Sequence, residues 1–297
     1  MRRLELPDSL RSFTSEQSPL WPLTTMRVGG PARWLVQPKS EQHLLLALAW
    51  IELHGLDYMV LGGGANVIFP SEGFPGAIVS VRKLKGIRFD ETGVTAACGE
   101  SLSALASQAN RVGLAGMEWA CGIPGTVGGA IVMNAGTSQG DMASILSSVR
   151  MITAEGECSL SARDLELGYR TSALRTGALQ GIVFVATFEL QRDDPVQCVR
   201  REREILRSRA QTLPIGASSG CIFRNPAEGS PAGLLLDQAG CKGLRVGSAV
   251  VSMQHANFIL NEGENNSDDV LELIRLMRQR VIDTHGIVLD TEVVLPR

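Results

Sequence analysis

Two glycine-rich loops constrain this chain more than any other feature of its sequence. Residues 61–66 read Leu-Gly-Gly-Gly-Ala-Asn after an apolar run, and residues 122–130 read Gly-Ile-Pro-Gly-Thr-Val-Gly-Gly-Ala. Glycine adopts positive φ angles and lets backbone N–H groups approach a ligand closely, because it has no side chain. Such loops predict backbone folded around an anionic group, with a nucleotide-like cofactor as the first hypothesis.

The flanking sequence places both loops next to regular elements. Ser40 can cap a helix that Gly55 ends, and residues 58–61 are typical of a buried strand that leads into the first loop. Residues 101–112 have helical spacing and come shortly before the second loop. Ligands in open α/β layers bind at the carboxyl ends of strands, so both loops could meet one ligand.

The remaining segments predict an α+β protein in two or three lobes. A charged helix is expected from Pro195 to about Ala210, and Ser267 with the two aspartates that follow can cap another. A domain boundary falls near the start of the charged helix. Strands are expected at residues 77–81, 94–98, 148–153, 182–190 and 288–295.

Composition excludes several classes of function. The 297 residues, 44% of them hydrophobic, are enough for a sizeable core. The net charge is −3, and no run of lysines and arginines is interleaved with aromatic residues, so we do not expect the protein to bind nucleic acid. The longest apolar stretch, 44–51, is too short for a membrane span and no secretion signal begins the chain, so we expect a cytoplasmic protein. The six cysteines and four histidines lack zinc-site spacing, so no metal is expected.

Two common phosphate-binding motifs are absent from the loops. A Walker loop needs a lysine that neither loop contains, and a Rossmann fingerprint fails because Val67 stands where its third glycine belongs. Tight turns and close helix packing would also explain the glycines.

The order of motifs along the chain resembles the UDP-N-acetylenolpyruvoylglucosamine reductase (MurB) family over nearly all of the sequence beyond about residue 20. Each motif alone is weak, but their order and spacing are jointly specific. The motifs are residues 25–32 (Thr-Met-Arg-Val-Gly-Gly-Pro-Ala), both glycine loops, 134–136, 168–172 (Gly-Tyr-Arg-Thr-Ser), 219–226 (Ser-Gly-Cys-Ile-Phe-Arg-Asn-Pro), 239–243, 255–258 and 291–293.

The resemblance implies an α+β fold with a two-lobed FAD-binding region of the vanillyl-alcohol-oxidase/PCMH type and a smaller α+β substrate-binding domain. The expected parts are residues 1–80 and 81–193 as FAD-binding subdomains, the second joined by a strand at 288–297, and residues 194–287 as the substrate-binding domain. The short span from Arg170 to Cys221 leaves no room for the tyrosine-bearing insertion of one subclass, so the chain resembles the shorter subclass.

The same resemblance implies cofactors and a reaction. FAD, bound non-covalently, takes hydride from NADPH and passes it to C3 of the enolpyruvyl ether of UDP-N-acetylglucosamine, giving UDP-N-acetylmuramate for peptidoglycan synthesis. Arg224 and Asn225 are expected near the UDP moiety, although a turn before Pro226 would also explain Asn225, and a monomer is favoured. The implied cofactor-binding residues are Gly62, Gly63, Gly64, Ala65, Asn66, Gly122, Ile123, Pro124, Thr126, Gly128, Gly129 and Asn134.

Three residues match the family's catalytic positions. Arg170 suits a substrate carboxylate because its guanidinium can make two parallel hydrogen bonds, although an ion pair would also explain it. Glu292 could orient Arg170 or polarise the substrate, or could face outward from a terminal strand. Cys221 stands where the family uses a serine proton donor.

A thiol can take over the serine's role. Its ordinary pKa of about 8.5 makes it a stronger acid than an alcohol. A nearby cation that lowered this pKa would produce a thiolate, which cannot donate, so we expect Cys221 to stay mostly protonated at neutral pH. A small buried residue in a turn is the alternative interpretation of Cys221.

Two other functions compete with this interpretation. One is an FAD-dependent alcohol or sugar oxidase or dehydrogenase of the same flavin-binding superfamily, in which FAD is often attached through histidine or cysteine. No histidine lies in either glycine loop, but Cys121 directly precedes the second. The other is a nucleotide-binding protein without turnover, which the presence of Arg170 and Glu292 disfavours.

Overall fold

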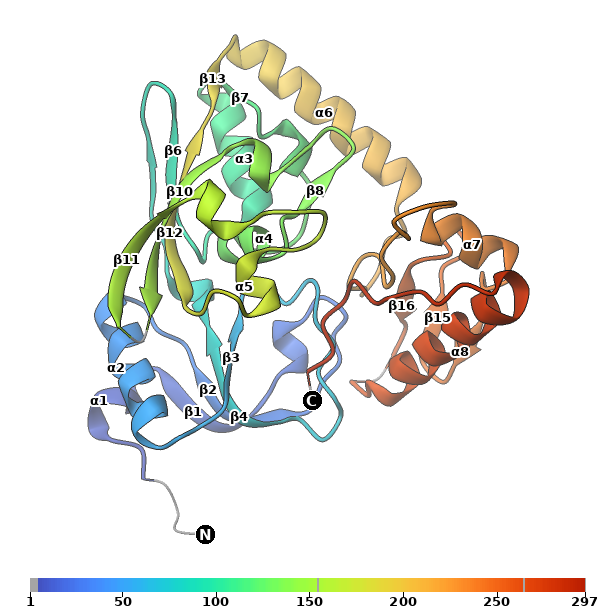
Figure 1. The fold of residues 1–297 in the computed structure, drawn as a ribbon, viewed down its shortest axis with the longest axis horizontal. Coiled ribbons are helices and arrows are strands. Elements are labelled where there is room, and N and C mark those ends of the chain that lie inside the picture. Colours follow the sequence, from blue (N-terminus) through green and yellow to red (C-terminus); the bar gives the residue numbers. More distant parts are fainter. Residues whose placement is uncertain (1–4, 154, 264, 297) are drawn as a thin grey trace. The chain divides into compact units, whose positions relative to one another are not determined.

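The computed structural model describes residues 5–153, 155–263 and 265–296. The chain forms two compact units, each assembled from separate segments (Figure 1). Unit 1 consists of Met1–Glu16, Trp34–Gly63 and Gly76–Arg207, and unit 2 of Gln17–Arg33, Gly64–Pro75 and Ser208–Arg297. Each unit has its own cluster of buried apolar side chains.

The larger sheet of unit 1 has five strands in the order β11-β10-β12-β6-β5, all paired antiparallel (Figure 1). A second sheet has the order β1-β2-β4-β3, and in it β3 and β4 are parallel, with Tyr58 opposite Ala77. The bounds are β1 Thr14–Pro19, β2 Pro31–Val36, β3 Tyr58–Leu61, β4 Phe74–Ser80, β5 Ile87–Phe89, β6 Gly93–Ala97, β10 Leu146–Thr153, β11 Gly156–Ser161 and β12 Ile182–Glu189.

The helices that flank the glycine loops begin at side-chain caps, as the sequence predicts. The Ser40 hydroxyl accepts a hydrogen bond from His43 N–H at the start of α2 (Glu41–Leu53), and Ser101 does the same for Ala104 at α3 (Leu102–Arg111). Both helices place their buried residues in the unit 1 core. The other helices of unit 1 are α1 Asp8–Arg11, α4 Val127–Val132 and α5 Ala173–Thr176.

Unit 2 packs two helices and a three-stranded antiparallel sheet around one core. The apolar face expected for α8 is confirmed, since Val270, Leu273, Ile274, Met277 and Val281 are all buried. The elements are α7 Ala232–Gln238, β14 Arg245–Val246, β15 Ala249–Val251, β16 Ile259–Asn261 and α8 Asp268–His285.

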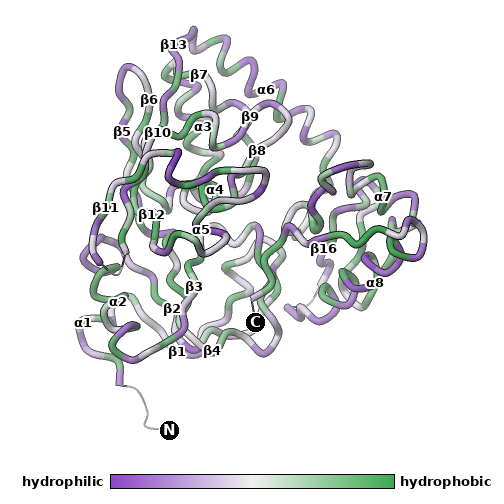
Figure 2. Tube along the Cα trace, in the orientation of Figure 1, coloured by the Kyte–Doolittle hydropathy of each residue, from purple (hydrophilic) through white to green (hydrophobic). Residues whose placement is uncertain are grey.

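The charged helix α6 extends from Pro195 to Thr212, two residues past the expected end. Cys198 is its buried residue, and Figure 2 colours much of its length as hydrophilic. None of the helices in the described part of the chain is both long and apolar enough to span a bilayer. The short elements are β7 Leu114–Ala115, β8 Gly136–Thr137, β9 Gly140–Asp141, β13 Gln191–Arg192, and the 3-10 helices η1 Trp21–Leu23, η2 Val81–Lys83, η3 Glu118–Ala120, η4 Met142–Ser144 and η5 Ala162–Leu165.

Two details differ from the sequence-based expectation. Ser267 precedes α8 but its side chain makes no cap hydrogen bond, because its hydroxyl lies 3.0 Å from that of Ser71 instead. The segment 288–295 is not a strand of a sheet. It forms isolated bridges from Thr291 to Phe223 and from Val294 to Val67, all within unit 2.

Candidate functional site

The two glycine loops, distant in sequence, touch each other in unit 1. A side chain on Gly62 would collide with the Thr126 hydroxyl, and one on Gly63 would collide with the backbone of Gly125. The first loop directly continues strand β3, and the second leads into helix α4. Close contact between the loops therefore requires glycine at positions 62 and 63, and the two loops form one cradle.

The second loop is fastened to the strand end beside it. Gly128 N–H donates to Cys98 C=O at 2.9 Å, and Val127 N–H donates to Glu100 C=O at the same distance. A side chain on Gly128 would approach the Cys98 Cβ to 2.9 Å. Burial raises the pKa of the Cys98 thiol to about 12, so this group stays neutral behind the loop.

Thr126 and the residues before it complete the second loop. The Thr126 hydroxyl accepts a hydrogen bond from Gly129 N–H at 3.4 Å and caps α4. Gly122 and Pro124 are exposed and Ile123 is partly exposed, while Gly122 N–H donates to the Ser103 hydroxyl at 2.7 Å. The loop thus presents an open, mainly backbone surface.

Arg82 is a residue of this site that the sequence analysis did not identify. It lies in η2, directly after strand β4, and its Nε and Nη2 donate to the carbonyls of Gly62 and Gly63 at 3.0 and 2.5 Å. No sequence motif identifies this arginine. Its partners are backbone atoms of the first glycine loop, which lies next to Arg82 because β3 and β4 pair in parallel and both segments follow the ends of these strands. Burial lowers the pKa of Arg82 from its ordinary value.

The cradle fits a ligand with anionic oxygens. Within the described residues, the N–H groups of Gly63 and Gly64 donate to no protein acceptor. Backbone N–H groups need a partner, and phosphate oxygens are the acceptors that glycine loops commonly hold. The diphosphate of FAD is a group of this kind.

Arg170 and Asn134 come together in the same unit. Arg170 Nη2 donates to Gly136 C=O at 2.7 Å and Nη1 to Asn134 C=O at 3.4 Å. Both residues adopt positive φ angles, 54° and 39°. Asn134 Nδ2 donates to Gly168 C=O at 2.8 Å, so Asn134 ties the end of the second loop to the turn that carries Arg170.

The side chain of Asn134 is engaged by protein groups on both of its polar atoms. Its Oδ1 accepts from Ala143 N–H at 3.0 Å, and its Nδ2 also lies 3.3 Å from Asp141 Oδ2. Only 2% of the residue is exposed. These contacts give Asn134 a structural role, and its direct contact with a cofactor stays a prediction.

In unit 2, Cys221 and Glu292 lie on neighbouring segments. Glu292 N–H donates to Ile222 C=O at 2.7 Å, and Cys221 forms an isolated bridge with Phe258. Asn66, the last residue of the first loop, donates from Nδ2 to Glu292 C=O at 3.2 Å and accepts from Val294 N–H at 3.0 Å. Cys221 is partly exposed and is not part of a disulfide, as a proton donor requires.

The residues expected near a UDP moiety have different surroundings. Arg224 Nε is buried without a hydrogen-bond acceptor among the described residues, so this cation could serve an anionic ligand. Asn225 Oδ1 accepts from Ala232 N–H at 3.0 Å at the start of α7. Asn225 thus has a structural contact, and its role toward substrate stays a prediction.

Both ends of the chain match family models. Residues 32–160 match the FAD binding domain model, and residues 211–296 match the model of the UDP-N-acetylenolpyruvoylglucosamine reductase C-terminal domain. The first match contains both glycine loops and Arg82. The second contains Cys221, Arg224 and Glu292.

Similar proteins match along most of the chain. A UDP-N-acetylenolpyruvoylglucosamine reductase from Synechococcus sp. (strain JA-3-3Ab) is 42% identical over 93% of this chain and 88% of its own length. One from Gloeobacter violaceus is 40% identical over 91% of this chain and 92% of its own. The crystal structure of UDP-N-acetylenolpyruvylglucosamine reductase from Thermus caldophilus superimposes with a TM-score of 0.80 at 35% identity, covering 96% of this chain and 98% of that one.

Proposed function

Because the chain belongs to the UDP-N-acetylenolpyruvoylglucosamine reductase family, we propose that it reduces UDP-N-acetylglucosamine enolpyruvate to UDP-N-acetylmuramate in peptidoglycan precursor synthesis, using FAD and NADPH. The observation that carries the proposal is the hydrogen bond from Glu292 N–H to Ile222 C=O. It holds Cys221 and Glu292, two of the three expected catalytic residues, on adjacent segments.

When bound, FAD supplies the redox chemistry by accepting hydride from NADPH and delivering it to C3 of the enolpyruvyl ether. Hydride addition at C3 leaves negative charge on C2 and on the attached carboxylate. The protein must then provide a cation near the carboxylate and a proton donor facing C2. We assign the cation and the proton donor to side chains of the protein.

We propose that Arg170 binds the substrate carboxylate. Its guanidinium is oriented by the carbonyls of Asn134 and Gly136, which reduces the entropy lost when it grips a ligand. Such preorganisation stabilises developing negative charge more than a mobile cation would.

Cys221 then gives its thiol proton to C2. The thiol must be protonated when hydride arrives, and a replacement proton comes from solvent because the residue is partly exposed. Glu292 orients substrate or polarises it beside the thiol. Arg224 neutralises part of the diphosphate charge of the sugar nucleotide.

The remaining assignments extend the proposal to the whole chain. The cofactor residues are those of the two glycine loops, FAD is held non-covalently, and the substrate-binding domain lies in residues 194–287. The protein acts as a monomer in the cytoplasm. Light scattering after size-exclusion chromatography, giving one 31.8 kDa species, would agree with the monomer, and a dimer mass would contradict it.

An anaerobic stopped-flow experiment tests the reaction. The flavoprotein is first reduced with one equivalent of NADPH and then mixed with UDP-N-acetylglucosamine enolpyruvate, and the flavin absorbance near 450 nm is followed. We expect rapid reoxidation by this substrate and none by UDP-N-acetylglucosamine, which lacks the enolpyruvyl group. Reoxidation only after oxygen is admitted would contradict the proposal and favour an oxidase.

A further inference from the structure

The first glycine loop is held from behind by one side chain. Arg82 donates from Nε to Gly62 C=O at 3.0 Å and from Nη2 to Gly63 C=O at 2.5 Å. These two donors belong to one planar guanidinium, so the two carbonyls must face the same group. Arg82 therefore sets the orientation of two successive peptide units.

That orientation decides where the loop's N–H groups point. The peptide bonds are trans, and in a trans peptide the C=O and N–H groups point in opposite directions. With the carbonyls of Gly62 and Gly63 turned toward Arg82, the N–H groups of Gly63 and Gly64 turn away from it. These are the two groups that donate to no acceptor among the described residues.

The charge of Arg82 strengthens the same arrangement. Each peptide dipole has its negative end on oxygen and its positive end on N–H. A guanidinium beside both oxygens polarises the two units, so their N–H ends attract an anion more strongly. The partial burial of Arg82 increases this effect, because water screens its charge less than on an open surface.

We propose that Arg82 is a positioning residue for the cofactor, which it serves by aiming the Gly63 and Gly64 N–H groups at the diphosphate of FAD. The inference rests on the proposed FAD-dependent function. Arg82 acts through the loop backbone, so its replacement should weaken FAD binding without changing the surroundings of the isoalloxazine ring.

The test measures FAD affinity directly. Apoprotein is titrated into FAD, and quenching of flavin fluorescence gives both the dissociation constant and the stoichiometry. For Arg82→Met we expect full stoichiometry with a dissociation constant raised about 10- to 100-fold, as for loss of charge-assisted hydrogen bonds. At saturating FAD, its visible absorption spectrum should match that of the parent.

Two further variants complete the design. Arg82→Lys keeps the charge but loses the planar fork, so we expect at least about threefold weaker binding but a smaller loss than for Arg82→Met. Arg88→Met is the matched control, because the Arg88 side chain is exposed and has no hydrogen-bond or ion-pair partner in the described part of the chain. Its dissociation constant should stay within about twofold of the parent value, well below the factor expected for the Arg82 variants.

The outcomes separate the inference from the function. Parent-like affinity in Arg82→Lys, or in folded Arg82→Met, would overturn the positioning role. A reduced stoichiometry with an unchanged dissociation constant would also overturn it, since that result describes a folding defect alone. If the parent apoprotein binds no FAD, the proposed function fails and not merely the role of Arg82.

Discussion

At the scale of single residues, the most informative position is Cys221. The family resemblance leads us to expect a serine there, and the chain carries a partly exposed cysteine that is not in a disulfide. The two side chains differ little in size but greatly in acidity, since an ordinary thiol titrates near pH 8.5. A cysteine in place of the expected serine can therefore serve the proposed role of proton donor.

Replacing Cys221 should separate the two half-reactions. Cys221→Ser should retain substantial turnover, because a hydroxyl can occupy the same position and donate a proton. Cys221→Ala should lower the rate of flavin reoxidation by substrate about 100-fold or more, the usual contribution of a positioned acid. Stopped-flow measurement should find flavin reduction by NADPH unchanged in both variants. Turnover of the alanine variant equal to that of the parent would show that Cys221 donates no proton.

Neighbouring segments of unit 2 place Cys221, and one asparagine fastens them. Asn257 Oδ1 accepts from Phe223 N–H at 2.9 Å, and its Nδ2 donates to Phe223 C=O at 2.8 Å. The residue is 2% exposed, so water cannot replace either bond. In the sequence, residues 255–258 are recognisable only as a family motif. Nothing in that motif indicates that Asn257 hydrogen-bonds to the backbone of Phe223.

Asn257→Ala should therefore lower the free energy of unfolding by about 2 to 4 kcal/mol, because a buried N–H and a buried C=O lose their partners together. Asn257→Asp should be destabilising as well, since it removes the donor to Phe223 C=O. Urea unfolding followed by circular dichroism measures both changes. A loss below about 0.5 kcal/mol for the alanine variant would contradict this account of the 221–223 segment.

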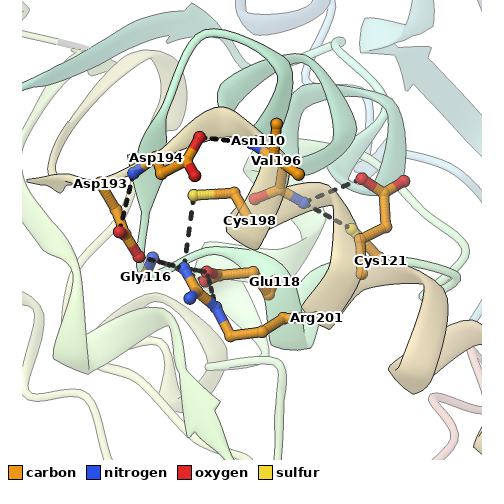
Figure 3. Close-up of polar contacts among 10 residues, drawn as sticks. Asn110, Gly116, Glu118, Cys121, Asp193, Asp194, Val196, Cys198 and Arg201 are labelled. Carbon is orange, nitrogen blue, oxygen red and sulfur yellow. Dashed lines mark hydrogen bonds and ion pairs between the residues drawn. The ribbon is translucent and has the colours of Figure 1, made fainter.

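At the scale of elements, a polar network holds the first turns of α6 against the rest of unit 1 (Figure 3). Arg201 Nη2 lies 2.7 Å from Glu118 Oε1 and 2.6 Å from Asp193 Oδ2, and Glu118 Oε2 accepts from Gly116 N–H at 2.7 Å. Farther along, Glu202 Oε2 accepts from Asn110 Nδ2 at 3.0 Å. A helix with little apolar surface is thus held to the unit by charged and polar contacts.

This network predicts a specific pH dependence of stability. The hydrogen bond from Arg201, followed by that from Asp194 N–H, lowers the pKa of Asp193. A carboxylate with a lowered pKa stabilises the fold above its unfolded pKa of about 3.9, and the contribution disappears as pH falls through the folded-state value. Asp193→Asn should therefore cost stability at pH 7 but progressively less below about pH 4.

Urea unfolding of parent and Asp193→Asn between pH 3 and 7 measures this difference. Glu155→Gln is a suitable comparison, because the pKa of Glu155 is also lowered, mainly by Thr153, but this residue lies outside the α6 network. An Asp193→Asn effect that is equal at every pH would exclude the ion pair with Arg201 as its source.

At the scale of the whole molecule, the family assignment implies a flavoprotein whose cofactor is not attached covalently. Cys121 directly precedes the second glycine loop in the sequence, but it is 1% exposed, and its Sγ accepts a hydrogen bond from Asn110 Nδ2 at 3.5 Å. A thiol in such surroundings is poorly placed to form a bond with a flavin.

Acid precipitation should therefore release all of the yellow colour into the supernatant, where absorbance near 450 nm measures it. Mass spectrometry of the pellet should give the unmodified chain mass. Flavin that remained with the precipitated protein would contradict non-covalent binding and favour the oxidase alternative.

Periodicity and capping patterns in the sequence were sufficient to predict β3, α2, α3 and the apolar face of α8. These elements depend on local spacing and on caps a few residues away, as at Ser40 and Ser101. Ser267 shows the limit of such local rules. Its hydroxyl forms a hydrogen bond with the hydroxyl of Ser71, which is far away in the sequence, and does not cap α8. The segment 288–295 has a strand-like composition but finds only isolated bridging partners.

By itself, the sequence predicted that glycine backbone lines a cradle for an anionic group, and its motif order identified the family. Only the tertiary structure decided that the two loops touch, that Arg82 hydrogen-bonds to the first of them, and that the segments carrying Glu292 and Cys221 are neighbours. The physical reason is that glycine content and local spacing restrict the backbone of a segment directly. Contacts between segments depend instead on strand pairing and core packing, which bring together backbone atoms that no sequence pattern marks.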